Sequence, residues 1–428
     1  MKTSKWILLT LMMAVIVFVS ACGQNNGANN KQALGGNEGK VTLKFWYPGH
    51  ETYVVDAVNK LIADFEQENP DIKIEYSAIP WKEFFQKLSV SYAGGIAPDI
   101  HGLGHGQLVS TVDQDQYMDL NRFIKEHQWD GEQDIIPSSL QSGQWNGGQY
   151  GLIMPAARPL FWRKDFFQEA GLDPNTPPRT LDELFEFANK VKVVENGKTV
   201  RSGIDIQTSN GEQSYFSLLL LLGQEIYDKD GNPLFDSPES IELLTKLVEL
   251  YNDGAIMAAN QQQLNGLPFT NGLAAMSFLN TMDLNTLKDT VGLDKLGYAL
   301  PPKGPTGKQT SLMLGNFISM SKSTKHPEEA WRFIEFMFSK EQMLEFSQAT
   351  GLLPTRQSLK EEFVKISPEN ELLFEAMNDS ASYIPSPAWN ANIKYLRLAL
   401  EEAFNGIKSA EEALKSNAAK AREELKDL

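Results

Sequence analysis

The sequence predicts an α/β fold arranged in two lobes, and three observations indicate it. Strand and helix patterns alternate as β-α-β-α-β over residues 41–100, an order that favours a parallel sheet with right-handed crossovers. Helical patterns with clear start signals return along the rest of the chain. The chain has 428 residues, more than one small hydrophobic core accommodates, so two lobes are expected.

Folded sequence is predicted to begin near Lys40, and its elements follow in order. Residues 41–46 form the first predicted strand, and alternating apolar residues predict a second strand over 72–76. Between them, apolar side chains recur on one helical face: Val54, Val58, Leu61, Ile62 and Phe65. A second helix over about 81–92 ends at Gly94-Gly95, and Pro98-Asp99-Ile100 starts the third strand.

Five later helices are predicted from their first residues, which carry a capping side chain or a first-turn proline. These start signals are Thr180 with Glu183, Ser237-Pro238, Pro327, Ser339 with Gln342, and Ser409 with Glu412. The apolar stretch 217–222 is too short to span a bilayer and is interpreted as a buried helix segment.

The N-terminus is typical of an export signal. Lys2 and Lys5 precede an apolar run over 7–19, which is shorter than the ~20 residues of a membrane span. The run ends at Ser20-Ala21-Cys22, which resembles a bacterial lipobox and implies a lipid on Cys22 after removal of residues 1–21. A plain signal peptide is the alternative. Residues 22–40 are rich in Asn and Gly and predict a flexible tether.

The net charge and the cysteine count exclude some classes of binding partner and a disulfide framework. Removing residues 1–21 removes Lys2 and Lys5 but no acid, so the net charge moves from −16 to −18. Such an acidic chain is not expected to bind nucleic acid or to adsorb directly on anionic lipid. The lipid on Cys22 would therefore provide the membrane attachment, and one cysteine excludes a disulfide framework.

The motifs of the sequence predict no metal site and no cofactor. His101 and His105 have the spacing of zinc ligands on a helix, but the glycines between them favour a Gly-rich loop after a strand. Such a loop lies where open α/β sheets bind ligands, so His105 is expected to face a cleft. The segment 228–233 begins like a calcium loop, but Pro233 replaces the required glycine and a tight turn is favoured.

Aromatic residues near the ends of predicted elements suggest a sugar site. Trp46 closes the first strand beside His50 and Glu51, and Trp389 precedes a helix. An aromatic ring covers the C–H face of a sugar, while neighbouring amides and carboxylates bind its hydroxyls. For each aromatic residue alone, core packing is the alternative.

Three blocks of sequence motifs follow one another along the chain. The first joins Gly95-Ile96-Ala97-Pro98-Asp99-Ile100 to Asp119-Leu120. The second includes Phe161-Trp162-Arg163-Lys164-Asp165 and Thr180-Leu181-Asp182-Glu183-Leu184. The third comprises Gly272-Leu273-Ala274-Ala275-Met276, Lys325-His326-Pro327-Glu328-Glu329-Ala330-Trp331 and Gly351-Leu352-Leu353-Pro354-Thr355-Arg356. In this order, the three blocks resemble the family 1 extracellular solute-binding proteins, the carbohydrate-binding lipoproteins of ABC importers.

The resemblance implies a type II fold, with mixed sheets flanked by helices and a hinge between two lobes. Lobe one would comprise 41–153 and 313–350, and lobe two 154–312 and 351–428. It also implies these ligand-binding residues: Trp46, His50, Glu51, His105, Arg158, Gln213, Tyr215, Asn280, Met282, Gly315, Asn316 and Trp389. Met282 stands where tryptophan is common in the family, and Ala156 where some members carry an acid.

By this resemblance the protein is expected to be a monomeric, non-catalytic receptor held at the outer face of a bacterial cell membrane. It would capture a mono- or oligosaccharide between its lobes and deliver it to ABC permease subunits. Arg158 raises the possibility of an acidic sugar, with a hinge salt bridge as the alternative. The rival functions are an exported carbohydrate-active enzyme and a binding protein for a non-sugar solute.

Overall fold

The computed structural model describes residues 40–208, 211–257, 268–378 and 380–427. The predicted signal segment and Cys22 lie outside the described residues, as does the predicted tether apart from Lys40. Within the described part of the chain, none of the helices has the length and apolar composition needed to cross a bilayer.

The first sheet contains the predicted β-α-β-α-β unit. Its strands follow the order β13-β12-β3-β1-β2, with β6 also paired to β12. They are β1 Val41–Pro48, β2 Ile72–Ile79, β3 Ile100–Gly104, β6 Leu152–Ala157, β12 Ser311–Met320 and β13 Ser380–Ala381. β1 is parallel to β2 and β3, which confirms the predicted parallel arrangement, whereas β12 is antiparallel to β3 and β6.

Helices from two distant parts of the chain pack on this sheet. They include α1 Thr52–Glu68, α2 Trp81–Ala93, α12 Pro327–Met337 and α13 Lys340–Thr350. The first sheet and the elements packed on it are called the first half, and the second sheet with its helices the second half. Smaller elements complete the first half: η1 His105–Gln107, α3 Leu108–Val112, α4 Asn121–Glu126, α5 Gly131–Asp134, α6 Pro137–Ser142, β4 Gln144–Trp145 and β5 Gly148–Gln149. The predicted apolar face of α1 is buried against this core, which also holds Trp331 from α12.

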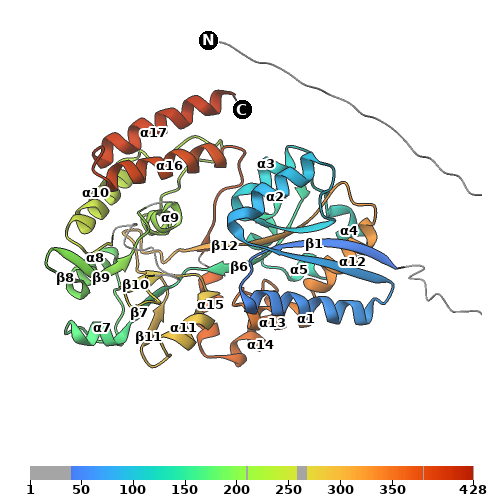
Figure 1. The fold of residues 1–428 in the computed structure, drawn as a ribbon, viewed down its shortest axis with the longest axis horizontal. Coiled ribbons are helices and arrows are strands. Elements are labelled where there is room, and N and C mark those ends of the chain that lie inside the picture. The colour runs from blue at the N-terminus through green and yellow to red at the C-terminus, as the bar shows by residue number, and fades with distance from the viewer. Residues whose placement is uncertain (1–39, 209–210, 258–267, 379, 428) are drawn as a thin grey trace, which may run out of the picture. The chain divides into compact units, whose positions relative to one another are not determined.

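The second sheet is also mixed and has the order β11-β7-β10-β9-β8. Its strands are β7 Leu160–Arg163, β8 Val193–Glu195, β9 Lys198–Asp205, β10 Ala274–Phe278 and β11 Leu296–Ala299. In Figure 1, β6 and β12 of the first sheet lie at the centre, with β1 on one side and β7 and β10 of the second sheet on the other. The observed fold class is therefore the predicted one, α/β with two mixed sheets flanked by helices.

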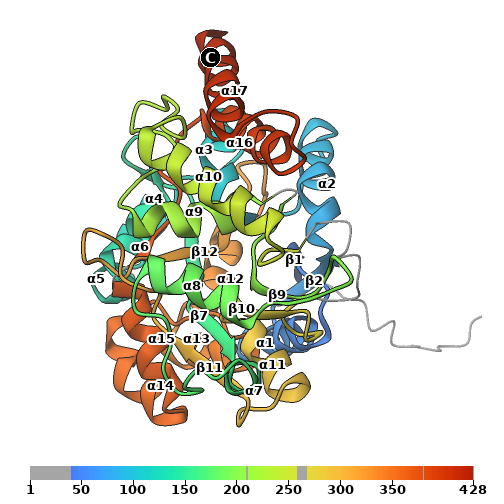
Figure 2. The same ribbon diagram turned by 90° about the vertical axis from the view of Figure 1, so that its left-hand side faces the viewer.

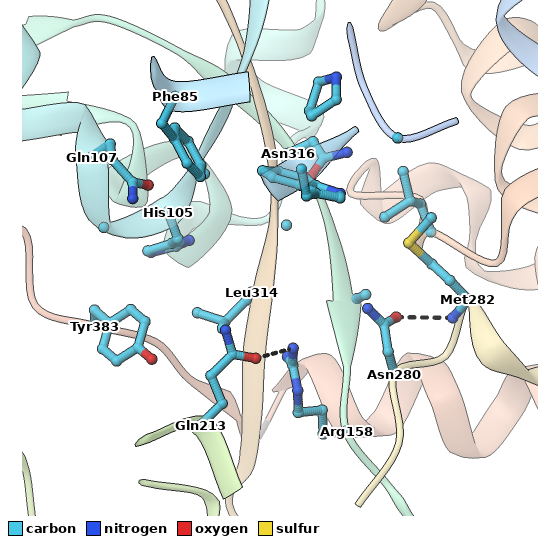
Figure 3. Close-up of a pocket in the computed structure, with 18 of the residues that line it drawn as sticks. Phe85, His105, Gln107, Arg158, Gln213, Asn280, Met282, Leu314, Asn316 and Tyr383 are labelled. Atoms are coloured by element: carbon cyan, nitrogen blue, oxygen red, sulfur yellow. Dashed lines mark hydrogen bonds between the residues drawn. The ribbon is translucent and has the colours of Figure 1, made fainter. Parts of the chain in front are cut away.

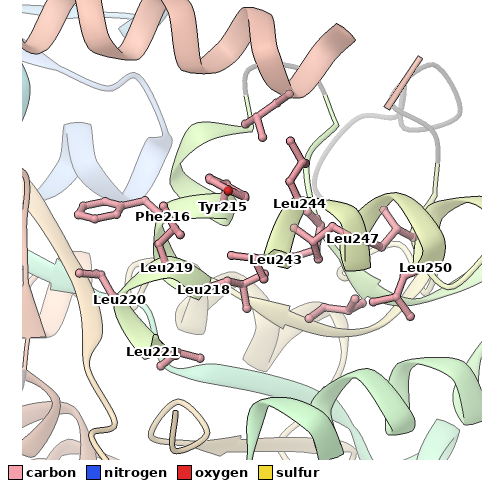
Figure 4. Packing of buried hydrophobic residues seen from close by; sticks show 14 of the residues in the cluster. Tyr215, Phe216, Leu218, Leu219, Leu220, Leu221, Leu243, Leu244, Leu247 and Leu250 are labelled. Atoms are coloured by element: carbon pink, nitrogen blue, oxygen red, sulfur yellow. The ribbon is translucent and has the colours of Figure 1, made fainter. Parts of the chain in front are cut away.

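Helices distant in sequence cover the second sheet. They are α7 Lys164–Glu169, α8 Leu181–Val191, α9 Glu212–Leu221, α10 Pro238–Asn252, α11 Asp283–Thr290, α16 Trp389–Phe404 and α17 Ala410–Glu424. The predicted buried segment 217–222 lies in α9 and at its end, where Leu218 and Leu219 pack with Leu243 and Leu247 of α10 (Figure 4). Figure 2 shows α16 and α17 beside α9 and α10, so the C-terminal helices close this core.

A third apolar cluster lies beside the second sheet. It joins Phe161 of β7 and Leu287 of α11 to Phe363 and Phe374 of two later helices. These are α14 Lys360–Ile366 and α15 Glu369–Asn378, preceded by η3 Gln357–Leu359. The last described element is η4 Leu425–Asp427.

All five predicted helix starts are observed. Ser409 and Glu412 form a complete capping box, whereas at α8 only half of the box forms. Thr180 caps the Glu183 amide there, but the Glu183 carboxylate accepts its backbone hydrogen bond from Arg179 instead.

Two local predictions needed correction. β1 extends two residues beyond its predicted end, so Trp46 lies inside the strand. Gly102 and Gly104 lie in β3 rather than in a loop, because the strand continues until η1 begins at His105. The segment after Tyr227 is the expected tight turn, in which the Asp228 carboxylate accepts hydrogen bonds from the backbone of Asp230 and Asn232.

Candidate functional site

A cavity of about 380 Å³ lies between elements of the two sheets. Its volume is at the low end of the ~300–1,000 Å³ range of small-molecule sites. The first sheet contributes the ends of β1 and β3, together with α2 and the middle of β12, and the second half contributes α9, α16 and the segment after β10. Figure 3 shows side chains from both halves facing this space.

Nine of the twelve predicted ligand-binding residues line this cavity. They are Glu51, His105, Arg158, Gln213, Asn280, Met282, Gly315, Asn316 and Trp389. They come from at least six separate segments of the chain, so their convergence is a product of tertiary folding. That any of them contacts a ligand remains a prediction.

The structure places the other three predicted residues outside the cavity lining. Tyr215 is buried in the hydrophobic core of the second half, and its hydroxyl donates a 2.7 Å hydrogen bond to the Ser240 carbonyl. Trp46 packs partly against an apolar cluster beside β3, and His50 is exposed at the end of β1. Tyr215 lies in α9, whose neighbouring Gln213 does reach the cavity.

Four lining side chains present buried polar atoms with no hydrogen-bond partner among the described residues. These atoms are Nδ1 and Nε2 of His105, Nη1 of Arg158, Oη of Tyr383 and Nε1 of Trp389. A buried polar group without a partner is costly, and such groups at a cavity wall are expected to be satisfied by what fills the cavity. The wall thus offers both hydrogen-bond donors and acceptors to a polar solute.

Burial also determines the protonation of the site. It lowers the pKa of His105 to about 4, so this imidazole is neutral at pH 7 and can donate one hydrogen bond and accept another. Burial lowers the pKa of the Arg158 guanidinium, which still remains protonated. Asp283 follows the lining residue Met282 in the chain. Burial raises the pKa of the Asp283 carboxyl to about 6, and the positive charge of Arg158 opposes this rise.

The lining also contains one close ion pair. Arg397 of α16 donates from Nε and Nη2 to the two carboxylate oxygens of Glu212, at 2.7 and 2.6 Å. Both partners line the cavity, and Glu212 is 2% exposed. This bidentate pair ties the start of α9 to α16 and engages both oxygens of Glu212.

Trp389 forms a contact across the cavity. It is the first residue of α16 and packs edge-to-face on Tyr383, with ring centroids 5.9 Å apart. On the opposite side lies Gly106 of η1, where an added Cβ would come within 1.9 Å of Cε2 and 2.3 Å of Nε1 of the indole. Only a residue without a side chain permits this approach, so Gly106 and Trp389 together form a contact between the two halves.

The strands between the two halves also approach closely at Gly315. β12 pairs there with β6, and an added Cβ on Gly315 would lie 2.5 Å from the Met154 carbonyl oxygen. The next residue, Asn316, donates a 3.1 Å hydrogen bond to the Tyr47 hydroxyl. These contacts hold the polar Asn316 side chain at the cavity wall.

The two histidines considered as metal ligands are separated by the fold. His101 is fully buried in β3, where Nε2 contacts the Tyr92 hydroxyl at 2.8 Å and Nδ1 contacts the Gly102 carbonyl at 2.9 Å. His105 lies in η1 and faces the cavity. Within the part of the chain that the structure describes, no cluster of three or more metal-ligating side chains occurs.

Several lining residues were missed by sequence reasoning, among them Phe85, Glu212, Tyr383 and Arg397. Tyr383 is an aromatic residue between regular elements, the same signal that identified Trp389, and could have been found. Glu212 and Arg397 are 185 residues apart, and no local pattern indicates their pairing.

Comparison with known proteins gives a family match over most of the chain. The family described as bacterial extracellular solute-binding protein matches residues 60–371. A binding protein of Brucella abortus (strain 2308) is 27% identical over 368 residues, covering 85% of this chain and 88% of the relative. The sn-glycerol-3-phosphate-binding periplasmic protein UgpB of Escherichia coli (strain K12) is 24% identical over 351 residues, covering 75% and 76%.

Solved structures share the fold. An ABC substrate-binding protein from Listeria monocytogenes in complex with cycloalternan superimposes with a TM-score of 0.81 at 20% identity, covering 90% of this chain and 99% of that one. CpMnBP1 with mannotriose bound gives a TM-score of 0.79 at 26% identity, covering 89% and 100%.

Proposed function

The chain belongs to the bacterial extracellular solute-binding protein family, and on that premise we propose that it captures a mono- or oligosaccharide in the cavity between its two sheets. It then delivers the sugar to the permease of an ABC importer. The observation that carries the proposal is the set of unpartnered polar atoms on His105, Arg158, Tyr383 and Trp389 around one cavity. The relative solved with mannotriose supports a saccharide as the solute.

The lining favours binding over catalysis. A glycosidase needs two carboxyl groups across the sugar, one of them able to exchange a proton. The carboxylates among the lining residues are Glu51 and Glu212, and both oxygens of Glu212 are held by Arg397. We therefore propose a non-catalytic receptor, with Glu51 as a hydrogen-bond acceptor for a sugar hydroxyl.

The proposal is tested by screening saccharides, polyamines, metal chelates and phosphate esters by thermal shift. Every hit is then titrated by calorimetry, and the sugar is recovered and analysed after long incubation. A mono- or oligosaccharide recovered unchanged is the expected result. Tight binding of another class of solute only, or turnover of the sugar, would contradict the proposal.

Lipid attachment at Cys22 is the proposed means of membrane retention. Cys22→Ser is expected to release the protein from the membrane or leave its signal unprocessed, because the acidic chain is not expected to adsorb on anionic lipid. Fractionation of cells expressing both forms, with mass spectrometry of the N-terminus, measures this. A membrane-bound mutant with a trimmed N-terminus would rule out the lipoprotein assignment.

Closure of the two halves on the ligand is the proposed binding motion, with β6 and β12 as connecting strands. Small-angle scattering is expected to give a smaller radius of gyration with saturating sugar than without it. The Gly106–Trp389 contact supports this, since it exists only when the halves lie close together. An unchanged radius at saturation would count against a hinged trap.

A further inference from the structure

Arg158 occupies an unusual position between β6 and β7. Its backbone N–H donates to the Ser311 hydroxyl at 3.0 Å, and its Nη2 donates to the Gln213 side-chain oxygen at 2.7 Å. Its Nη1 is buried at the cavity wall and has no partner in the described part of the chain. Figure 3 shows the guanidinium turned towards Gln213, below Leu314.

This arginine differs from every other arginine of the protein. The sequence contains nine, and all lie within the described residues. Eight have a carboxylate oxygen within 4 Å of a guanidinium nitrogen: Arg122, Arg163, Arg179, Arg201, Arg332, Arg356, Arg397 and Arg422. Arg158 alone is partly buried with only neutral hydrogen-bond partners.

The nearest acids do not neutralise Arg158 by direct contact. The Glu212 carboxylate is held at both oxygens by Arg397, and Asp283 accepts a backbone hydrogen bond from Asn280 at 3.1 Å. Both act on Arg158 only through space. Burying a charge is costly unless it is paired with an opposite charge. The Arg158 guanidinium has no such partner in direct contact, and its Nη1 lies at the cavity wall, where an anionic ligand could pair with it.

We propose that the ligand is a saccharide carrying a carboxylate, of the uronic acid class, and that the Arg158 guanidinium binds this carboxylate. The proposal rests on the proposed function and specifies its substrate class. Guanidinium nitrogens match the geometry of a carboxylate, and the charge-assisted hydrogen bond satisfies Nη1. The neutral donors and acceptors of His105, Tyr383 and Asn280 remain for the hydroxyl groups.

A phosphate ester is a poorer match to the same wall. A phosphate monoester carries a charge of about −1.5 to −2 at pH 7, which is more than one guanidinium balances. The other lining arginine, Arg397, is already paired with Glu212. One unpaired guanidinium balances one carboxylate.

The test is calorimetry at pH 7 with matched pairs of saccharides that differ only in a carboxylate. Glucuronic acid and galacturonic acid, and disaccharides ending in them, are compared with their neutral counterparts and with sn-glycerol 3-phosphate. Hydrogen bonds to charged groups contribute ~1.5–3 kcal/mol, so an acid is expected to bind at least about tenfold more tightly than its neutral partner. Arg158→Gln should reduce that preference to less than about threefold, and Arg158→Lys should retain part of it.

Arg163→Gln is the matched control, because it removes a partly buried arginine five residues away that pairs with Asp165 outside the cavity lining. It should leave the acid preference unchanged. Melting temperatures of all variants report on folding. Equal binding of acid and neutral sugars by the wild type, or equal losses for both in Arg158→Gln, would overturn the uronic acid assignment while leaving sugar binding intact. Binding of sn-glycerol 3-phosphate with no saccharide binding would overturn the proposed function as well.

Discussion

Replacing Trp389 with alanine is expected to weaken saccharide binding at least about tenfold. Truncating a large aromatic side chain in a binding site costs ~2 kcal/mol or more, which is about thirtyfold in affinity. Trp389 lines the cavity, presents an unpartnered Nε1 and packs on Tyr383. It also touches Gly106 in the other half, so the truncation removes a contact of the closed form as well.

Calorimetric affinity and melting temperature of Trp389→Ala should be measured on one preparation. An unchanged affinity with a much lower melting temperature would mean that Trp389 only packs in the hydrophobic core and does not contact the ligand. Gly106→Val separates the two roles at the cavity, because its side chain would block the contact between halves without removing the indole. A loss in Gly106→Val that disappears in the Trp389→Ala background would identify the contact between halves as the main contribution.

Replacing Trp331 with alanine is expected to lower the free energy of unfolding by ~3–5 kcal/mol, as for other buried tryptophans. Trp331 is 0% exposed in α12, stacks on Phe123 with ring centroids 5.7 Å apart and meets Trp129 edge-to-face at 5.8 Å. Alanine leaves a cavity that these rings cannot fill without leaving their own contacts. Urea denaturation monitored by circular dichroism measures the effect.

Each tryptophan variant serves as the experimental control for the other. Trp331 lies outside the cavity lining, so Trp331→Ala should retain wild-type affinity at a temperature where it is folded. A stability loss below about 1 kcal/mol would contradict the assignment of Trp331 to the core, since ordinary surface substitutions stay within ~0.5 kcal/mol.

Most of the fold could be predicted because its determinants are local. The period of the apolar residues in α1 and the caps at Ser237 and Ser409 act within a few residues, and both were read correctly. The end of β3 was misplaced because glycine is a poor strand former and signals a loop. Here the two strand glycines are required by close neighbours: a Cβ on Gly102 would meet Pro48, and one on Gly104 would meet Phe85.

Residues that line the cavity could be predicted only where their position along a helix or strand determines the direction of the side chain. His105 and Asn280 were predicted from their places after strands and from the family resemblance, because strand ends meet at one edge of each sheet. The family resemblance placed Tyr215 in the site together with Gln213, but two residues along a helix turn a side chain to a different face. The pairing of Glu212 with Arg397 depends on how α16 packs on α9, and a single sequence contains no signal for it.

The order of elements along the chain is expected to delay folding until synthesis is nearly complete. β12 supplies the first sheet with a strand that pairs with β3 more than 200 residues earlier, and the second core needs Leu396 and Leu414 from the last two helices. Neither hydrophobic core can close while the C-terminal quarter is missing, and such long-range contacts form slowly. A protein threaded through a membrane N-terminus first would thus remain unfolded during passage and assemble both halves together on the far side.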